Sequence, residues 1–150
     1  MTIRQIALTA VFALGMAGLV VAKGADQKLQ MKDLPAAVQK GVTANLNDGT
    51  LKDLSKEVEG GKTIYEVETT LNGRTRDFLL DATGRLIELE DEMAMDAVPA
   101  AVKTALETQG KIVKVESVTR GKVVTYEGTV EKGGKRSEVA LDANGKKVKG

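Results

Sequence analysis

The side chains that could act together in acid–base chemistry are the carboxylates of Glu66 and Glu68. They stand two residues apart in a predicted strand, so both project from the same face of that strand. Two carboxylates can serve as general acid and general base when their environments separate their pKa values. Charges at a spacing of two are also typical of the solvent-facing side of an antiparallel sheet. No cleft or aromatic platform is evident around them, so we interpret them as a solvated sheet face and predict no catalytic residue.

Histidine and cysteine are both absent from the sequence. Their absence removes the imidazole base, the thiolate nucleophile and the usual ligands of zinc. The two serines, Ser55 and Ser137, lie in strand patterns without a Ser-x-x-Lys arrangement. The Gly-Gly-Lys segments at 60–62 and 133–135 are predicted hairpin turns, whereas a phosphate-binding loop joins a strand to a helix. The sequence therefore predicts a protein that is not an enzyme and has no cofactor.

Two acidic turns are the sequence features closest to a cation site. Asp81-Ala82-Thr83-Gly84 and Asp142-Ala143-Asn144-Gly145 carry oxygen-bearing side chains at close spacing. Neither continues to the further ligands and terminal Glu of a calcium loop. Asp in the first position and Gly in the last are favoured by a type I turn. We interpret both segments as turns and predict no metal site.

Each half of the sequence begins with a predicted helix that follows a proline. Leu34-Pro35-Ala36-Ala37-Val38 is matched 64 residues later by Val98-Pro99-Ala100-Ala101-Val102. Proline suits the first turn of a helix, and glycine commonly follows the last turn. The predicted helices run to Leu46 and Gln109. After each helix the apolar residues alternate, which predicts strands at 51–59, 62–71, 75–80, 86–90, 112–118, 123–131, 136–141 and 146–149.

The two halves also share their hairpins. Tyr65–Glu88 and Tyr126–Lys149 are identical at seven of 24 positions, including the Asp-Ala-x-Gly turns. An internal repeat explains these identities. The predicted fold is therefore α+β, with two tandem repeats at 33–91 and 92–150, each with one helix packed on an antiparallel sheet of about four strands. The acidic run from Glu88 to Asp96 is interpreted as a solvated connector between them.

The first 22 residues form a different segment. Arg4 precedes an uncharged apolar run of 17 residues at 6–22, and small residues follow it. This pattern is typical of a cleaved secretory signal peptide, and the run is shorter than the about 20 residues of a membrane span. We expect a signal peptide at 1–22, a flexible lead-in at 23–32 and a periplasmic or secreted protein. The alternative is an inner-membrane anchor formed by an uncleaved segment 6–22.

The composition argues against nucleic acid as a partner. Loss of Arg4 leaves 21 Lys and Arg against 21 Asp and Glu, so the processed chain is close to neutral. Nucleic-acid binding depends on an excess of basic residues at phosphates, and single strands also need aromatic stacking surfaces. The chain has only two Tyr, two Phe and no Trp. We therefore expect no nucleic-acid partner and no membrane contact after signal cleavage.

Taken together, the two halves of the sequence resemble the PepSY-like domains of secreted bacterial proteins, which are related in fold to the β-lactamase inhibitor protein. The resemblance rests on the Pro-Ala-Ala-Val helix starts, the Tyr-Glu strands and the Leu-Asp-Ala-x-Gly turns, and it covers Leu34 to Gly150. It implies an exported, non-enzymatic binding or regulatory module with an unidentified protein partner, such as a secreted or periplasmic peptidase that it binds or inhibits. A periplasmic protein that binds a small ligand or a cation is the alternative.

The resemblance to the inhibitor protein points to a sheet face as the binding surface. This chain lacks the disulfides and the aromatic-rich face through which that protein grips its target. Polar side chains occupy the corresponding positions, where the alternation predicts the solvent-facing side. The candidate partner-binding residues are Glu66, Glu68, Thr75, Asp77, Thr125, Glu127, Thr129, Arg136 and Glu138.

Overall fold

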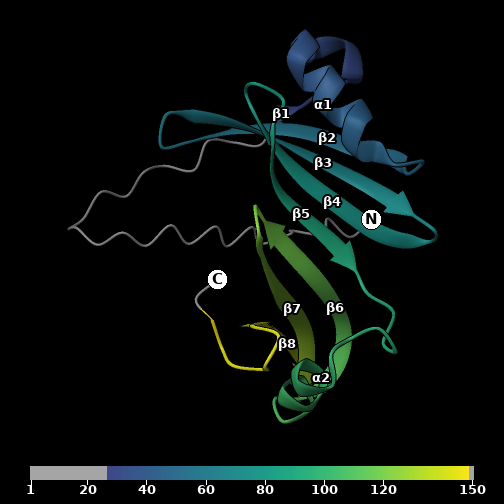
Figure 1. The fold of residues 1–150 in the computed structure, drawn as a ribbon, viewed down its shortest axis with the longest axis vertical. Coiled ribbons are helices and arrows are strands. Elements are labelled where there is room, and N and C mark those ends of the chain that lie inside the picture. Colours follow the sequence, from purple (N-terminus) through teal and green to yellow (C-terminus); the bar gives the residue numbers. More distant parts are fainter. Residues whose placement is uncertain (1–26, 149–150) are drawn as a thin grey trace.

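The computed structural model describes residues 27–148, and the predicted signal peptide lies outside the described residues. Figure 1 shows the two helices at opposite ends of the molecule, with the strands between them. The elements in chain order are β1 (Gln27–Lys28), the 3₁₀ helix η1 (Met31–Asp33), α1 (Ala36–Leu46), β2 (Thr50–Glu59), β3 (Lys62–Leu71), β4 (Arg74–Asp81), β5 (Leu86–Glu92), α2 (Ala100–Glu107), β6 (Lys111–Arg120), β7 (Val123–Lys132) and β8 (Lys135–Leu141).

All eight strands belong to one antiparallel sheet whose spatial order equals the chain order, from β1 to β8. The prediction of two tandem repeats, each with its own sheet of about four strands, is wrong. β5 pairs with β6, placing Leu89–Glu92 opposite Thr119–Glu116, and this pairing joins the two halves. A strand left at the edge of a separate sheet would expose its N–H and C=O groups, and the pairing satisfies them.

The second half of the chain contributes three strands, not four. Of the segment predicted as a last strand at 146–149, the described residues 146–148 make only an isolated bridge, which joins Lys147 to Leu141. At the other end of the sheet, part of the predicted lead-in forms β1, which pairs Gln27 and Lys28 with Lys56 and Ser55 of β2. The sheet therefore extends further toward the N-terminus and less far toward the C-terminus than the alternation alone indicates.

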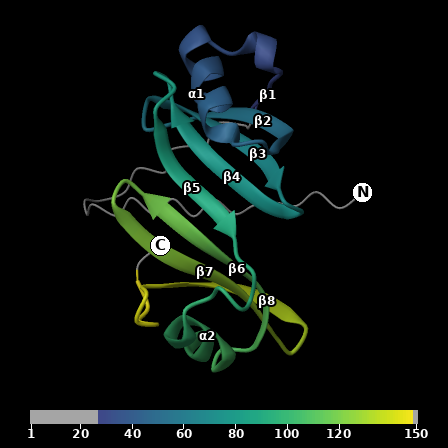
Figure 2. The same ribbon diagram turned by 45° about the vertical axis from the view of Figure 1, so that its right-hand side comes forward.

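Local turn signals account for the hairpins. Asn72 and Gly73 take positive φ angles of 53° and 78° between β3 and β4, as a two-residue type I′ turn requires. Gly60-Gly61 and Gly133-Gly134 join β2 to β3 and β7 to β8, again with positive φ. Figure 2 shows strands β4 to β7 running side by side through the centre of the molecule.

Both helices pack on the same face of the sheet. Directly opposite residues of neighbouring strands share a face. Val67, Phe78, Leu89 and Thr119 are successive partners across β3 to β6. The first three of these belong to the apolar cluster beneath α1, and Val115, on the face of Thr119, belongs to the cluster beneath α2. The opposite face carries no helix among the described residues, and we call it the helix-free face.

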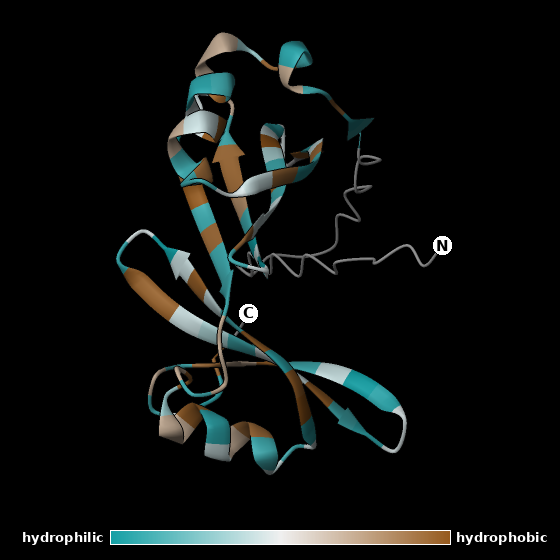
Figure 3. Cartoon of the chain, turned by 90° about the vertical axis from the view of Figure 1, so that its right-hand side faces the viewer, coloured by the Kyte–Doolittle hydropathy of each residue, from teal (hydrophilic) through white to brown (hydrophobic). Residues whose placement is uncertain are grey.

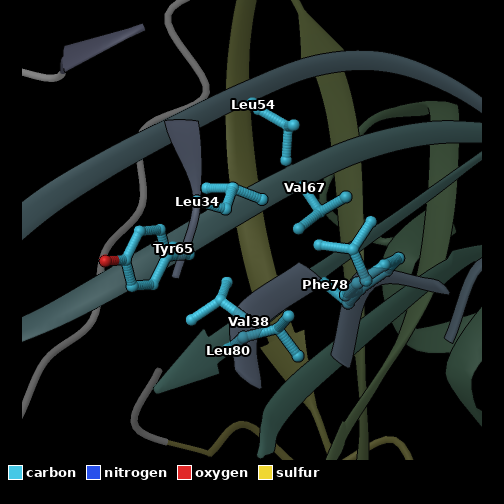
Figure 4. Packing of buried hydrophobic residues seen from close by; sticks show 8 residues of the cluster. Leu34, Val38, Leu54, Tyr65, Val67, Phe78 and Leu80 are labelled. Carbon is cyan, nitrogen blue, oxygen red and sulfur yellow. The ribbon is translucent and has the colours of Figure 1, made fainter. Parts of the chain in front are cut away.

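Two separate apolar clusters hold the helices. Figure 4 shows the first, in which Leu34 and Val38 meet the side chains of the sheet. Its buried members are Leu34, Val38, Val42, Leu54, Tyr65, Val67, Phe78 and Leu80. The second contains Val98, Val102, Leu106, Val115, Val130 and Leu141. Neither buried set contains a residue of β5, so the β5–β6 junction is joined by backbone pairing and by the side chains on its two faces.

The shared sequence motifs meet in space at each helix. Gly84, in the turn after β4, lies so close to α1 that an added Cβ would stand 2.1 Å from the carbonyl oxygen of Ala37. Gly145 stands in the same relation to Ala101, at 2.5 Å. Both glycines also have positive φ, at 78° and 74°. The Asp-Ala-x-Gly turns and the Pro-Ala-Ala-Val segments therefore position each helix against the sheet.

Candidate functional site

The register places all nine candidate residues on the helix-free face. Three of the candidates, Glu68, Asp77 and Thr125, lie in one row across five strands. In this row Glu68, Asp77, Glu90, Val118 and Thr125 are successive cross-strand partners from β3 to β7. The remaining candidates share this face by alternation or by pairing, and they are Glu66, Thr75, Glu127, Thr129, Arg136 and Glu138. Figure 3 shows the alternation of polar and apolar residues along the strands.

The centre of the helix-free face is buried and acidic. Glu88 of β5 is only 8% exposed. It accepts a hydrogen bond from Nε of Arg120, on β6, at 2.5 Å. The interpretation of the run from Glu88 to Asp96 as a solvated connector is therefore wrong for its first part, because the strand extends to Glu92 and pairs on both sides. We call Glu88, Glu90, Glu116, Glu127 and Arg120 the junction cluster.

Glu90 is the most perturbed acid of the junction cluster. Burial raises its pKa to about 9, and a hydrogen bond to Glu88 and the negative charges of Glu88, Glu116 and Glu127 act in the same direction. At neutral pH Glu90 is therefore protonated. The Glu88 carboxylate beside it pairs with the guanidinium of Arg120.

Asp77 and Glu127 extend this environment to β4 and β7. Burial raises the pKa of Asp77 to about 6, against the effect of the Thr69 N–H, which donates to Oδ1 of Asp77 at 3.0 Å. Burial also raises the pKa of Glu127, and the positive charge of Arg120 acts in the opposite direction. Carboxyl groups on four neighbouring strands thus lie in a partly desolvated part of the face.

Thr75 connects three strands at the edge of this region. Its N–H and its hydroxyl each donate to Oε2 of Glu92 at 3.0 Å, and its hydroxyl also lies 3.4 Å from Oε1 of Glu116. The hydrogen bond from the Thr75 backbone lowers the pKa of Glu92. Lys114 donates to Oε1 of Glu116 at 2.6 Å. The polar groups at this position fix β4, β5 and β6 relative to one another.

The sequence reasoning missed the acids of β5 and their partner Arg120. The alternation of Glu88, Glu90 and Glu92 was a signal that they share a face. Their burial depends on β6, whose paired residues lie 24 to 30 positions further along the chain, and no local signal predicts this pairing. That the candidate residues on β3, β4, β7 and β8 share one face could be predicted because hairpins keep partners close in sequence; their role in binding a partner stays a prediction.

In both acidic turns the Asp carboxylate accepts hydrogen bonds from backbone N–H groups of its own turn. Oδ1 of Asp81 accepts hydrogen bonds from the N–H and the hydroxyl of Thr83, at 2.9 and 2.6 Å, and from the N–H of Arg85 at 3.1 Å. The Thr83 hydroxyl is the main cause that lowers the pKa of Asp81 to about 2. Oδ1 of Asp142 accepts from the N–H groups of Asn144 and Lys146 in the same way. The interpretation of both segments as turns is confirmed.

Within 27–148 no group of three or more acidic side chains could hold a metal ion. No helix of this part of the chain is both long and apolar enough to cross a membrane. What the helix-free face presents is an array of carboxylates, hydroxyls and a few cations on a rigid sheet, which suits hydrogen bonds and charge pairs with a partner surface.

Comparisons with solved structures agree with this architecture. The chain is similar to a BLIP-like protein from Bacteroides fragilis, with 20% identity, a TM-score of 0.58, and coverage of 77% of this chain and 84% of that one. A DUF2874 family protein from Bacteroides uniformis gives 17% identity, a TM-score of 0.61, and coverage of 77% and 86%. A protein from Bacteroides eggerthii, provisionally described as periplasmic, gives 15% identity, a TM-score of 0.63, and coverage of 77% of this chain and 86% of that one. These likenesses show a BLIP-like fold.

Comparison with protein-family models and with curated proteins yields no match.

Proposed function

We propose that this protein is an exported, non-enzymatic binding module that engages a protein partner through the helix-free face. The observation that carries the proposal is the register, which collects nine polar candidate residues from four strands on one face without a helix. Both helices and both apolar clusters lie on the other side. A hydrogen-bonded sheet fixes the backbone from which these groups project, which reduces the ordering cost of binding to that of the side chains.

The fold supports the same proposal. The BLIP-like protein from Bacteroides fragilis has a similar fold. The similar protein from Bacteroides eggerthii is provisionally described as periplasmic. We extend both points to this chain, with residues 1–22 as a cleaved signal peptide. A secreted or periplasmic enzyme, such as a peptidase, is the partner class that we propose. Kinship with PepSY-like domains, suggested by the shared motifs, belongs to the same proposal.

Capture followed by direct binding measurements tests the proposal. The immobilised processed protein is exposed to a periplasmic extract, and each recovered protein is purified and titrated against it. Reversal of charge at Glu66 and Glu68 should weaken binding of a true partner at least about tenfold, because both side chains lie in the proposed interface. Glu107→Lys, on the exposed surface of α2, is the matched control and should leave the affinity unchanged.

Two outcomes would contradict the proposal. One is equal weakening by the helix-side control, which would show a general charge effect and not a face-specific one. The other is a partner whose affinity ignores Glu66 and Glu68 but falls with substitutions on α1 or α2. In that case the binding surface would be the helix side of the sheet.

A further inference from the structure

β8 ends the sheet with one side unpaired along most of its length. It pairs with β7 from Lys135 to Leu141. Within residues 27–148 its other side is covered only near its end, where the Val148 N–H donates to the carbonyl oxygen of Ala140 at 3.0 Å. Residues 132–138 are all exposed. At the opposite end of the sheet, β1 pairs with β2. Free backbone groups on an edge strand are a template for another strand.

The direction of these free groups follows from the pairing. Along a strand, the N–H and C=O of one residue point to the same side, and those of the next residue point to the other side. The Ala140 carbonyl points away from β7, because it accepts from Val148. The same is therefore true of Glu138 and Arg136, whereas the groups of Ser137 point toward β7. β8 offers two outward N–H and two outward C=O groups between residues 136 and 138.

We propose that two copies of this chain join through their β8 edges, antiparallel and with a two-fold axis at Ser137. This arrangement places Arg136 opposite Glu138 of the partner subunit, and the reciprocal pair follows from symmetry. The outward groups of these residues then form four backbone hydrogen bonds across the axis. Each copy thus contributes both a cation and an anion to the helix-free side of the new strand pair.

The charges of Arg136 and Glu138 favour an axis at Ser137 over an axis at residue 136 or 138. Antiparallel pairing requires opposite residues to direct their backbone groups toward each other, so the two-fold axis must pass through a residue and not between two. An axis at residue 136 would oppose two arginines, and an axis at residue 138 would oppose two glutamates, which is destabilising. Only the axis at Ser137 pairs opposite charges. The net charge of +1 for the full chain adds little long-range repulsion between copies.

The dimer goes beyond the proposed function and does not depend on it. It joins two eight-stranded sheets into one sheet of sixteen strands, with the two helix-free faces on the same side. Arg136 and Glu138 would then be interface residues between copies, and the residues nearer β5 would remain open to a partner. In Figure 2 the β7–β8 hairpin lies at the periphery of the molecule, away from α1.

A single cysteine tests the register directly, because the chain has none of its own. In Ser137→Cys the two thiols would face each other in a non-hydrogen-bonded pair, with Cα atoms about 4.5 Å apart, which suits a disulfide. Lys135→Cys is the matched control, because its two copies would stand about 13 Å apart at about 3.3 Å per residue. Mild oxidation of the purified protein should crosslink most of the first variant and little of the second. Equal crosslinking, or none, overturns the proposal.

Sedimentation of the unmodified and substituted proteins from about 10 µM to about 1 mM provides the second test, since small interfaces associate weakly. The unmodified protein should dimerise within this range. Glu138→Arg and Arg136→Glu should each weaken dimerisation at least about tenfold, and the double exchange should restore it. Glu138→Pro should abolish dimerisation while the fold is kept, because only an outward N–H is lost. A monomer at every concentration, or a dimer indifferent to Glu138→Pro, contradicts the inference.

Discussion

In the junction cluster, the protonation of Glu90 is determined by its surroundings more than by its residue type. Glu90 is flanked on its own strand by Glu88 and faces acids on β6 and β7, and burial removes most of the water that would stabilise its charge. The group keeps its proton at neutral pH, and this reduces the repulsion that the sequence suggests. Arg120 neutralises the remaining charge. An acidic stretch that looks solvated can therefore lie in the middle of a sheet.

This protonation predicts how stability changes with pH. The pKa of Glu90 is about 9 in the fold and near its ordinary value of 4.5 in the unfolded chain, so the folded state binds the extra proton between these values. The free energy of unfolding should fall as pH rises from about 5 to about 9, by up to about 1.4 kcal/mol for each pH unit. Glu90→Gln keeps a neutral hydrogen-bonding group and should flatten this slope, which urea unfolding at several pH values measures.

Asp77→Asn is the matched control for this experiment. The pKa of Asp77 is raised only to about 6, so its contribution to the slope ends near that pH. Its substitution should remove the fall in stability between about pH 4 and about pH 6 and leave the slope between pH 7 and pH 9 in place. A slope in the alkaline range that survives Glu90→Gln would show that another group carries it.

Gly84 gives a second prediction at the scale of one residue. Its φ is 78°, and an added Cβ would stand 2.1 Å from the carbonyl oxygen of Ala37. Gly73 has the same φ but nothing within 4 Å of an added Cβ. Gly73→Ala should therefore cost only about 1 kcal/mol, the cost of the left-handed conformation. Gly84→Ala should cost at least about 2 kcal/mol more, because α1 must shift away from the turn. Equal losses in chemical denaturation would argue against this contact.

At the scale of helices and strands, the sequence predicts the features that depend on residues close together in the chain. The Asn72-Gly73 turn and the alternation on both sides of it specify a hairpin, and the helix starts at Pro35 and Pro99 are equally local. The pairing of β5 with β6 is different, because α2 lies between the two strands in sequence and no turn residue specifies the register. Two separate sheets and one continuous sheet have the same local pattern. The buried half of the junction cluster was missed for this reason, whereas the shared face of the candidates on the hairpins could be predicted.

The junction between β5 and β6 should depend on the pair of Glu88 and Arg120. Glu88 is 8% exposed, and Arg120 is its cationic partner at 2.5 Å. Arg120→Met would leave a buried carboxylate without its counter-charge, which should cost about 2 kcal/mol, less than a fully buried pair because Arg120 is partly exposed. Glu88→Gln in the same chain should recover part of the loss. Denaturation of the four proteins of this cycle measures the coupling, and strictly additive losses would contradict it.

The whole molecule combines one continuous sheet with two separate apolar clusters. Backbone pairing runs unbroken from β1 to β8, but burial is concentrated under α1 and under α2. The junction between them has four paired residues on each strand. Hydrophobic burial supplies most of the stability of a fold, so each half should open with its own cluster as a local unit. A loss of stability in one half should then reach the other half only in part, through the continuous hydrogen-bonded sheet.

Hydrogen exchange of a core variant tests this division. Leu106 is fully buried beneath α2, and Leu106→Ala should cost about 3 kcal/mol. Its effect should be concentrated on the half that contains the cavity, so amide exchange in β6 to β8 should accelerate far more than in β2 to β4. Phe78→Leu, in the other cluster, should produce the reverse pattern. Uniform acceleration across all strands in both variants would show that the sheet opens as a single unit, and that the junction is as strong as the strand pairs within each half.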